Sequence, residues 1–116
     1  MEKKKTPCHG RVRETRRGDQ ITYELFCEGD CDEGECDKIR TKPDHHGTWI
    51  EYCGCPGGER TCNIYIETDG RGNKRIDCFT LGCGDGQECK LVQTGTIEDP
   101  EQTLVDWKCV CKPVSD

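Results

Sequence analysis

Twelve cysteines, spaced in the same pattern twice, constrain this chain more than any other feature. In each group of six, a long interval is followed by two short intervals, a second long interval and a final Cys-x-Cys pair. Agreement at this many points is a strong sign of an internal repeat. It predicts two tandem six-cysteine modules at residues 8–55 and 62–111, a basic N-terminal segment at 1–7, a linker at 56–61 and a C-terminal tail at 112–116.

The composition leaves little apolar surface for a conventional core. Hydrophobic residues make up 31% of the 116 residues, a share that counts the cysteines, whereas charged residues make up 34%. Such a chain would normally be disordered, because it buries too little apolar surface to offset the entropy lost on folding. Abundant cysteine in a short chain is instead typical of a disulfide scaffold, where each bridge contributes about 2–4 kcal/mol. We therefore expect six disulfides to replace most of the missing core.

The same cysteines indicate where the protein works. Disulfides persist outside the reducing cytosol, so we expect an extracellular, cell-surface or periplasmic protein. The start of the chain, Met1–Cys8, is charged and lacks an apolar stretch, so we expect no signal peptide in this chain. We also expect no membrane span, because no segment has the necessary apolar length.

Alternating apolar and polar residues predict strands rather than helices. The alternation occurs in three segments, 21–27, 62–66 and 104–111. Turn residues lie at the centre of all four long cysteine intervals, around positions 17–18, 44–45, 70 and 99. Each long interval therefore predicts a hairpin, and the expected fold class is a small, disulfide-rich, all-β protein with two hairpins in each module.

In such a hairpin the two end cysteines lie on opposite strands, within reach of a disulfide. The hairpins therefore predict four bridges, Cys8–Cys27, Cys36–Cys53, Cys62–Cys78 and Cys89–Cys109. The remaining cysteines then form Cys31–Cys55 and Cys83–Cys111. Spacing alone does not fix the connectivity of six cysteines, so this pairing is a hypothesis.

Metal binding is the main alternative to disulfides. Twelve thiols in a reducing compartment would suit zinc or copper, and the chain would then be a metal-binding or redox protein. Structural zinc sites favour close cysteine pairs, but this chain has no Cys-x2-Cys pair. We therefore expect no cofactor if the bridges form. Asp44, His45 and His46 are a separate candidate for a metal site or a pH switch, although polar residues are ordinary in a turn.

The tripeptide Arg17-Gly18-Asp19 lies at a predicted hairpin tip and resembles the integrin-binding signal of some cysteine-rich proteins. The match covers three residues, and Gly-Asp is also ordinary hairpin chemistry. A further alternative for the whole chain is a ligand-like or inhibitory module that grips a receptor or an enzyme through its hairpin tips.

No cluster of residues has the pattern of a catalytic site, and we expect no enzyme activity. Ser115 is the only serine, and complete pairing of the cysteines leaves no thiolate nucleophile. The net charge of -6 argues against a nucleic-acid partner, and a domain this small rarely builds a small-molecule pocket.

We expect a structural or binding protein whose partner is a protein, either another chain or a second copy of itself. Unpaired sheet edges can accept a strand from a neighbour. Residues 1–17 are basic and the rest of the chain is acidic. Such a basic head could dock on the acidic body of the next copy, which would give a head-to-tail oligomer or fibre.

Overall fold

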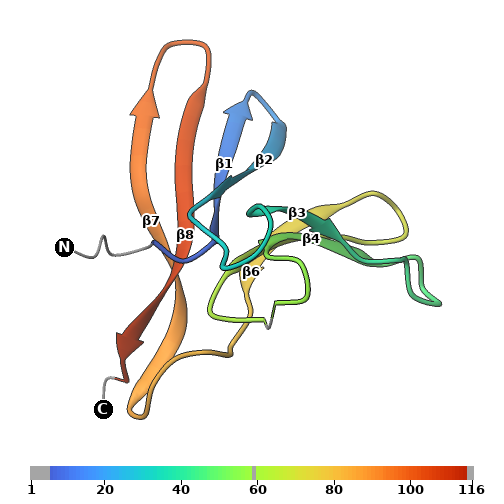
Figure 1. Cartoon of the computed structure of the whole chain (residues 1–116). Coiled ribbons are helices and arrows are strands. Elements are labelled where there is room, and N and C mark those ends of the chain that lie inside the picture. Colours follow the sequence, from blue (N-terminus) through green and yellow to red (C-terminus); the bar gives the residue numbers. More distant parts are fainter. Residues whose placement is uncertain (1–5, 59, 115–116) are drawn as a thin grey trace.

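Figure 1 shows the computed structural model of the chain, which describes residues 6–58 and 60–114. Eight strands form two antiparallel four-stranded sheets, and the described residues contain no helix. The first sheet has the strand order β2-β1-β8-β7, and the second has the order β3-β4-β5-β6. The predicted all-β, disulfide-rich fold is therefore present. The strands are β1 (His9–Arg17), β2 (Gln20–Glu28), β3 (Asp37–Arg40), β4 (Trp49–Gly54), β5 (Ile64–Thr68), β6 (Lys74–Cys78), β7 (Gln87–Glu98) and β8 (Thr103–Pro113).

Four hairpins join consecutive strands, one in each long cysteine interval, as the turn residues predict. The β1–β2 turn has only two residues, and Gly18 adopts there a φ of 59°, which other residues rarely take. In the other three turns, the carboxylate of Asp44, Asp69 or Asp99 accepts hydrogen bonds from backbone N–H groups a few residues ahead. These short polar side chains reinforce the backbone hydrogen bonds that close the same turns, such as the bond from the N–H of Asp69 to the carbonyl oxygen of Asn73.

Each sheet combines one hairpin from either side of residues 56–61. Strand β1 pairs with β8, where Val12 lies opposite Trp107, and β4 pairs with β5, where Glu51 lies opposite Ile66. The two pairings are equivalent when residues are counted from the cysteines. Val12 and Ile66 are each four residues after the first cysteine of their half, and their partners, Trp107 and Glu51, are each two residues before the fifth cysteine of theirs. The two halves therefore share both sheets, and the module boundaries at 8–55 and 62–111 stay a prediction.

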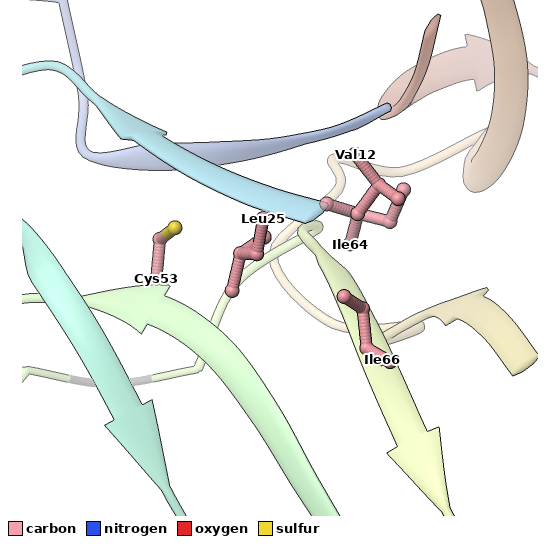
Figure 2. Close-up of a cluster of buried hydrophobic side chains, with 5 residues drawn as sticks. All are labelled: Val12, Leu25, Cys53, Ile64 and Ile66. Carbon is pink, nitrogen blue, oxygen red and sulfur yellow. The ribbon is translucent and has the colours of Figure 1, made fainter. Parts of the chain in front are cut away.

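The core is small and lies where the two sheets cross (Figure 1). In β1 every second residue is buried, which is the pattern of a strand with one face toward the core. Gly10 contributes to the close approach of the sheets, because a Cβ atom there would lie 3.1 Å from a methyl group of Ile64 and 3.1 Å from one of Leu25. Figure 2 shows the five buried side chains of the cluster, Val12, Leu25, Cys53, Ile64 and Ile66.

Candidate interaction surfaces

All twelve cysteines lie in the described part of the chain, and all of them form disulfides. In each half, the first cysteine pairs with the fourth, the second with the fifth and the third with the sixth. No bridge joins the residues before position 56 to those after position 61. The bridges are Cys8–Cys36, Cys27–Cys53, Cys31–Cys55, Cys62–Cys89, Cys78–Cys109 and Cys83–Cys111.

Two of the predicted bridges, Cys31–Cys55 and Cys83–Cys111, are present, and the other four predictions are wrong. The wrong pairs are Cys8–Cys27, Cys36–Cys53, Cys62–Cys78 and Cys89–Cys109. Three of the turns are centred one residue beyond the midpoint of their cysteine interval, so the residue that faces each cysteine is displaced by two positions. The β7–β8 turn lies slightly further along, and the irregularity between Gln93 and Gly95 brings the displacement back to two positions at Cys109. Cys27, for example, lies opposite Gly10 rather than Cys8, and Cys109 lies opposite Leu91.

Two of the observed bridges fasten a strand of one sheet to a strand of the other. Cys27 in β2 of the first sheet bonds to Cys53 in β4 of the second, and Cys78 in β6 of the second bonds to Cys109 in β8 of the first. Such bridges persist in an oxidising environment such as the extracellular space. Three groups of cysteine sulfurs lie close enough to hold a metal ion, but they are bridge sulfurs rather than the thiolates that bind metals.

The structure places Arg17-Gly18-Asp19 at the exposed tip of the β1–β2 hairpin. Arg17 ends β1, and Gly18 and Asp19 form the turn. A Cβ atom at Gly18 would meet nothing within 4 Å, so the space around this turn is open. The guanidinium of Arg17 donates a hydrogen bond of 3.5 Å to Gln102, in the neighbouring β7–β8 turn. The tripeptide is therefore accessible, with its arginine held toward the adjacent hairpin.

Asp44, His45 and His46 lie in the exposed loop between β3 and β4. The Asp44 carboxylate accepts hydrogen bonds from the backbone N–H groups of Thr48 and His46, at 3.0 and 2.8 Å, and these bonds lower the pKa of Asp44. The two imidazole rings lie 3.9 Å apart between centroids. The carboxylate thus shapes the turn, and among the described residues neither histidine belongs to a group of three potential metal ligands.

The basic head is largely neutralised within the fold where the structure describes it. Arg11 contacts both Glu28 and Asp106, and Arg13 donates a hydrogen bond of 2.9 Å to Asp106. Arg16 forms an ion pair with the buried Glu14 of the same strand. Lys3, Lys4 and Lys5 lie outside the described residues. The arginines of β1 therefore add less free positive charge to the surface than their number suggests.

The two outer strands of the first sheet form its candidate interaction edges. Strand β2 pairs along its whole length with β1 and contains no proline, lysine or bulge, which are the usual protections of an edge. Strand β7 has an irregularity between Gln93 and Gly95, beyond which pairing with β8 continues to Glu98. Ile21 in β2 is 54% exposed and Ile97 in β7 is 55% exposed. A β-branched residue close to a predicted turn is the sequence signal for each of these edges, but strand order and exposure cannot be deduced from it.

The two exposed isoleucines lie toward the same end of the first sheet. In the pairing of β2 with β1, Ile21 lies opposite Arg16. At the other edge, Ile97 lies opposite Leu104 of β8, and Leu104 lies opposite Thr15 of β1, the residue before Arg16. This end is formed by the tips of the β1–β2 and β7–β8 hairpins (Figure 1). Each outer edge therefore offers an apolar side chain next to a strand with an open side.

No family model, no curated protein and no solved structure matches this chain. Nowhere in the described ranges is there a helix with the length and apolar character that a membrane crossing needs. We therefore infer the function from the scaffold and from its surfaces.

Proposed function

We propose that this chain is a non-enzymatic structural protein of the extracellular space, the cell surface or the periplasm, and that it assembles head-to-tail through the edges of its first sheet. The observation that carries the proposal is the pair of open edge strands, β2 and β7, each with a half-exposed isoleucine. The six bridges support the location, because they need an oxidising compartment.

The directions of the strands suit an open chain of copies. Neighbouring strands of the first sheet are antiparallel, so β2 and β7, at opposite edges of a four-stranded sheet, run in opposite directions. A second copy placed beside the first by translation would then bring its β7 antiparallel to β2. Such a contact uses two different surfaces and leaves one of each free, so it repeats without closing.

The energy of this contact would come from backbone pairing and from the two isoleucines. Full burial of such a side chain contributes about 1.5–3 kcal/mol, so a half-exposed isoleucine can gain about 1 kcal/mol. Strand β2 carries Glu24 and Glu28 and no basic residue, and β7 carries Glu88 and Glu98 with Lys90. Because both edges are acidic, added salt should favour assembly by screening their repulsion.

Complementing variants test this proposal. We expect Ile21→Lys and Ile97→Lys each to abolish assembly in sedimentation velocity, because each introduces a charge on one edge. A mixture of the two variants should form a one-to-one dimer and nothing larger, because one intact β2 edge and one intact β7 edge remain. Leu81→Lys, at a loop residue that is 53% exposed, is the matched control and should assemble as the parent does.

Two outcomes would count against assembly. The first is a parent protein that stays monomeric at every concentration and salt. The second is a mixture of the edge variants that gives no dimer.

The exposed Arg17-Gly18-Asp19 turn favours a second candidate, a ligand-like module that binds a receptor through this tip. Asp19→Glu keeps the charge and the fold but displaces the carboxylate. If the tip is the binding surface, this variant should lose adhesion of integrin-bearing cells to the immobilised protein, and the edge variants should keep it. Equal adhesion to the parent and to Asp19→Glu would remove this candidate.

A further inference from the structure

A groove of about 650 Å³ lies at one end of the second sheet, between the loop that follows β2 and the segment around Arg60, and it reaches the buried residues Cys53 and Asn63. Ile64 and Ile66 of β5 are buried in the core, so Tyr65 between them and its cross-strand partner Tyr52 face the other way. The groove lies beside these rings. Its lining includes Ile39, Tyr52, Phe79, Asp30, Glu33 and Arg60.

Aromatic rings form one side of the groove. The ring of Phe79 packs edge-on against Tyr52, at 5.1 Å between centroids, and lies 4.8 Å from the ring of Tyr65. The guanidinium carbon of Arg60 lies 5.2 Å from the Phe79 centroid and 5.7 Å from the Tyr52 centroid. Both distances are within the range of cation–π attraction, so this ring pair already accommodates one guanidinium.

Carboxylates lie at the rim of the groove, in addition to the aromatic rings. Asp30 and Glu33, both exposed, belong to the loop that follows β2 and contribute to the lining together with Asp32. Arg60 is the basic residue of the lining, and among the described residues it makes no ion pair with Asp30 or Glu33. More negative than positive groups line this hollow, which gives it a potential that attracts cations.

We propose that this groove binds an arginine or lysine side chain from an exposed basic segment of a partner protein. The cation would lie on the faces of Tyr52 and Phe79, and the carboxylates of Asp30 and Glu33 would neutralise it at the rim. Arg60 occupies the same ring faces within the chain and so competes with the incoming cation. The site is separate from the edges of the first sheet and uses none of their residues.

The probe for this proposal is the peptide acetyl-Gly-Arg-Gly-Arg-Gly-amide, titrated into the oxidised full-length protein and followed by tyrosine ring signals in NMR. Its control is the same peptide with citrulline in place of arginine, which keeps the shape and removes the charge. We expect binding of the arginine peptide, weaker binding of a lysine peptide because Arg stacks better on rings, and no binding of the citrulline peptide.

Three substitutions distinguish a cation site from a merely structural cluster. Arg60→Gln removes the internal competitor and should tighten binding of the arginine peptide about threefold. Tyr52→Leu removes a ring face and should weaken it about fivefold, the size of a typical cation–π contribution. Glu33→Gln should weaken it about threefold at low salt, and the loss should shrink at high salt. Glu101→Gln, the same change of charge in the exposed β7–β8 turn, should have no effect.

The decisive result is that Arg60→Gln tightens binding of the arginine peptide whereas Tyr52→Leu weakens it. If the cluster were only structural, both substitutions would change the affinity in the same direction. If Tyr52→Leu fails to fold, the exposed positions Arg60 and Glu33 still decide the matter. Equal binding of the arginine and citrulline peptides, or equal losses for Glu33→Gln and Glu101→Gln, would overturn the proposal.

Discussion

Asn63 joins the two sheets, and its replacement by alanine gives a sharp test of the fold. Its side chain is buried, and its Oδ1 accepts hydrogen bonds from the backbone N–H groups of Gly10 and Ile64, at 2.8 and 2.9 Å. Its Nδ2 donates a hydrogen bond of 2.6 Å to the carbonyl oxygen of Cys53. Gly10 lies in β1 of the first sheet, whereas Cys53 and Ile64 lie in β4 and β5 of the second. One amide therefore satisfies three backbone groups at the crossing.

We expect Asn63→Ala to lower the free energy of unfolding by about 3 kcal/mol. A buried group that loses its hydrogen-bond partner costs about 1–3 kcal/mol, and a water molecule in the space left by the amide would recover part of the cost of three groups. The assay is guanidinium unfolding of the oxidised protein, followed by tryptophan fluorescence. Asn73→Ala is the control, because Asn73 is exposed and, among the described residues, its side chain bonds to Asp69 alone, so we expect a change within about 0.5 kcal/mol. Equal effects of the two substitutions would refute the assignment of Asn63 as the junction.

Further predictions concern a bridge, an ion pair and the glycine at the crossing. Replacing Cys27 and Cys53 together by alanine should lower the free energy of unfolding by about 3.5 kcal/mol, from the loop that this bridge closes, and denaturant titration measures it. The hydrogen bond from Arg13 lowers the pKa of Asp106, so the stability that this carboxylate contributes is present above about pH 4 and is lost as the pH falls through its folded pKa. The difference in unfolding free energy between the parent and Asp106→Asn should therefore shrink below about pH 4 when unfolding is measured as a function of pH. A difference that stays constant with pH would show that the ion pair of Arg13 with Asp106 is not its cause. Gly10→Ala should cost about 1–3 kcal/mol in thermal or denaturant unfolding, because the added methyl group would crowd the neighbouring strands.

The sequence is informative about local structure because turn chemistry is local. Gly18 supplies the positive φ that a two-residue turn needs, and Asp44, Asp69 and Asp99 supply carboxylates that bond to nearby backbone N–H groups. Each of these signals depends on residues a few positions apart, so all four hairpins could be predicted. The bridges Cys31–Cys55 and Cys83–Cys111 are also present as predicted, but the prediction rested on assigning the other eight cysteines to hairpin bridges that are wrong.

Register could not be predicted with the same means. The midpoint of a cysteine interval locates a turn only to within one or two residues, and an error of one residue in the turn displaces the facing partner by two. That error is enough to move Cys27 from Cys8 to a position opposite Gly10. The true partner, Cys53, lies on the other sheet, and no local pattern indicates how the sheets cross.

The residues that join the halves were also invisible in the sequence. Asn63 is a single polar residue beside a cysteine, and only the crossing of the sheets makes it the partner of Gly10. The rings of Tyr52 and Phe79 are 27 positions apart in the sequence and meet through the pairing of β4 with β5 and of β5 with β6. The contacts of these residues depend on pairing between segments that are distant in the sequence, whereas the periodicity of a sequence indicates only local structure.

Mapping of the disulfides in unreduced protein tests the central account most directly. Trypsin cleaves after Arg60, an exposed residue between the two groups of cysteines. Mass spectrometry of the unreduced peptides should then show three bridges on each side of this cut, with Cys27 joined to Cys53 and Cys78 joined to Cys109. A peptide that links Cys8 to Cys27, a bridge that crosses the cut, or cysteines alkylated before reduction would contradict the scaffold described for this chain.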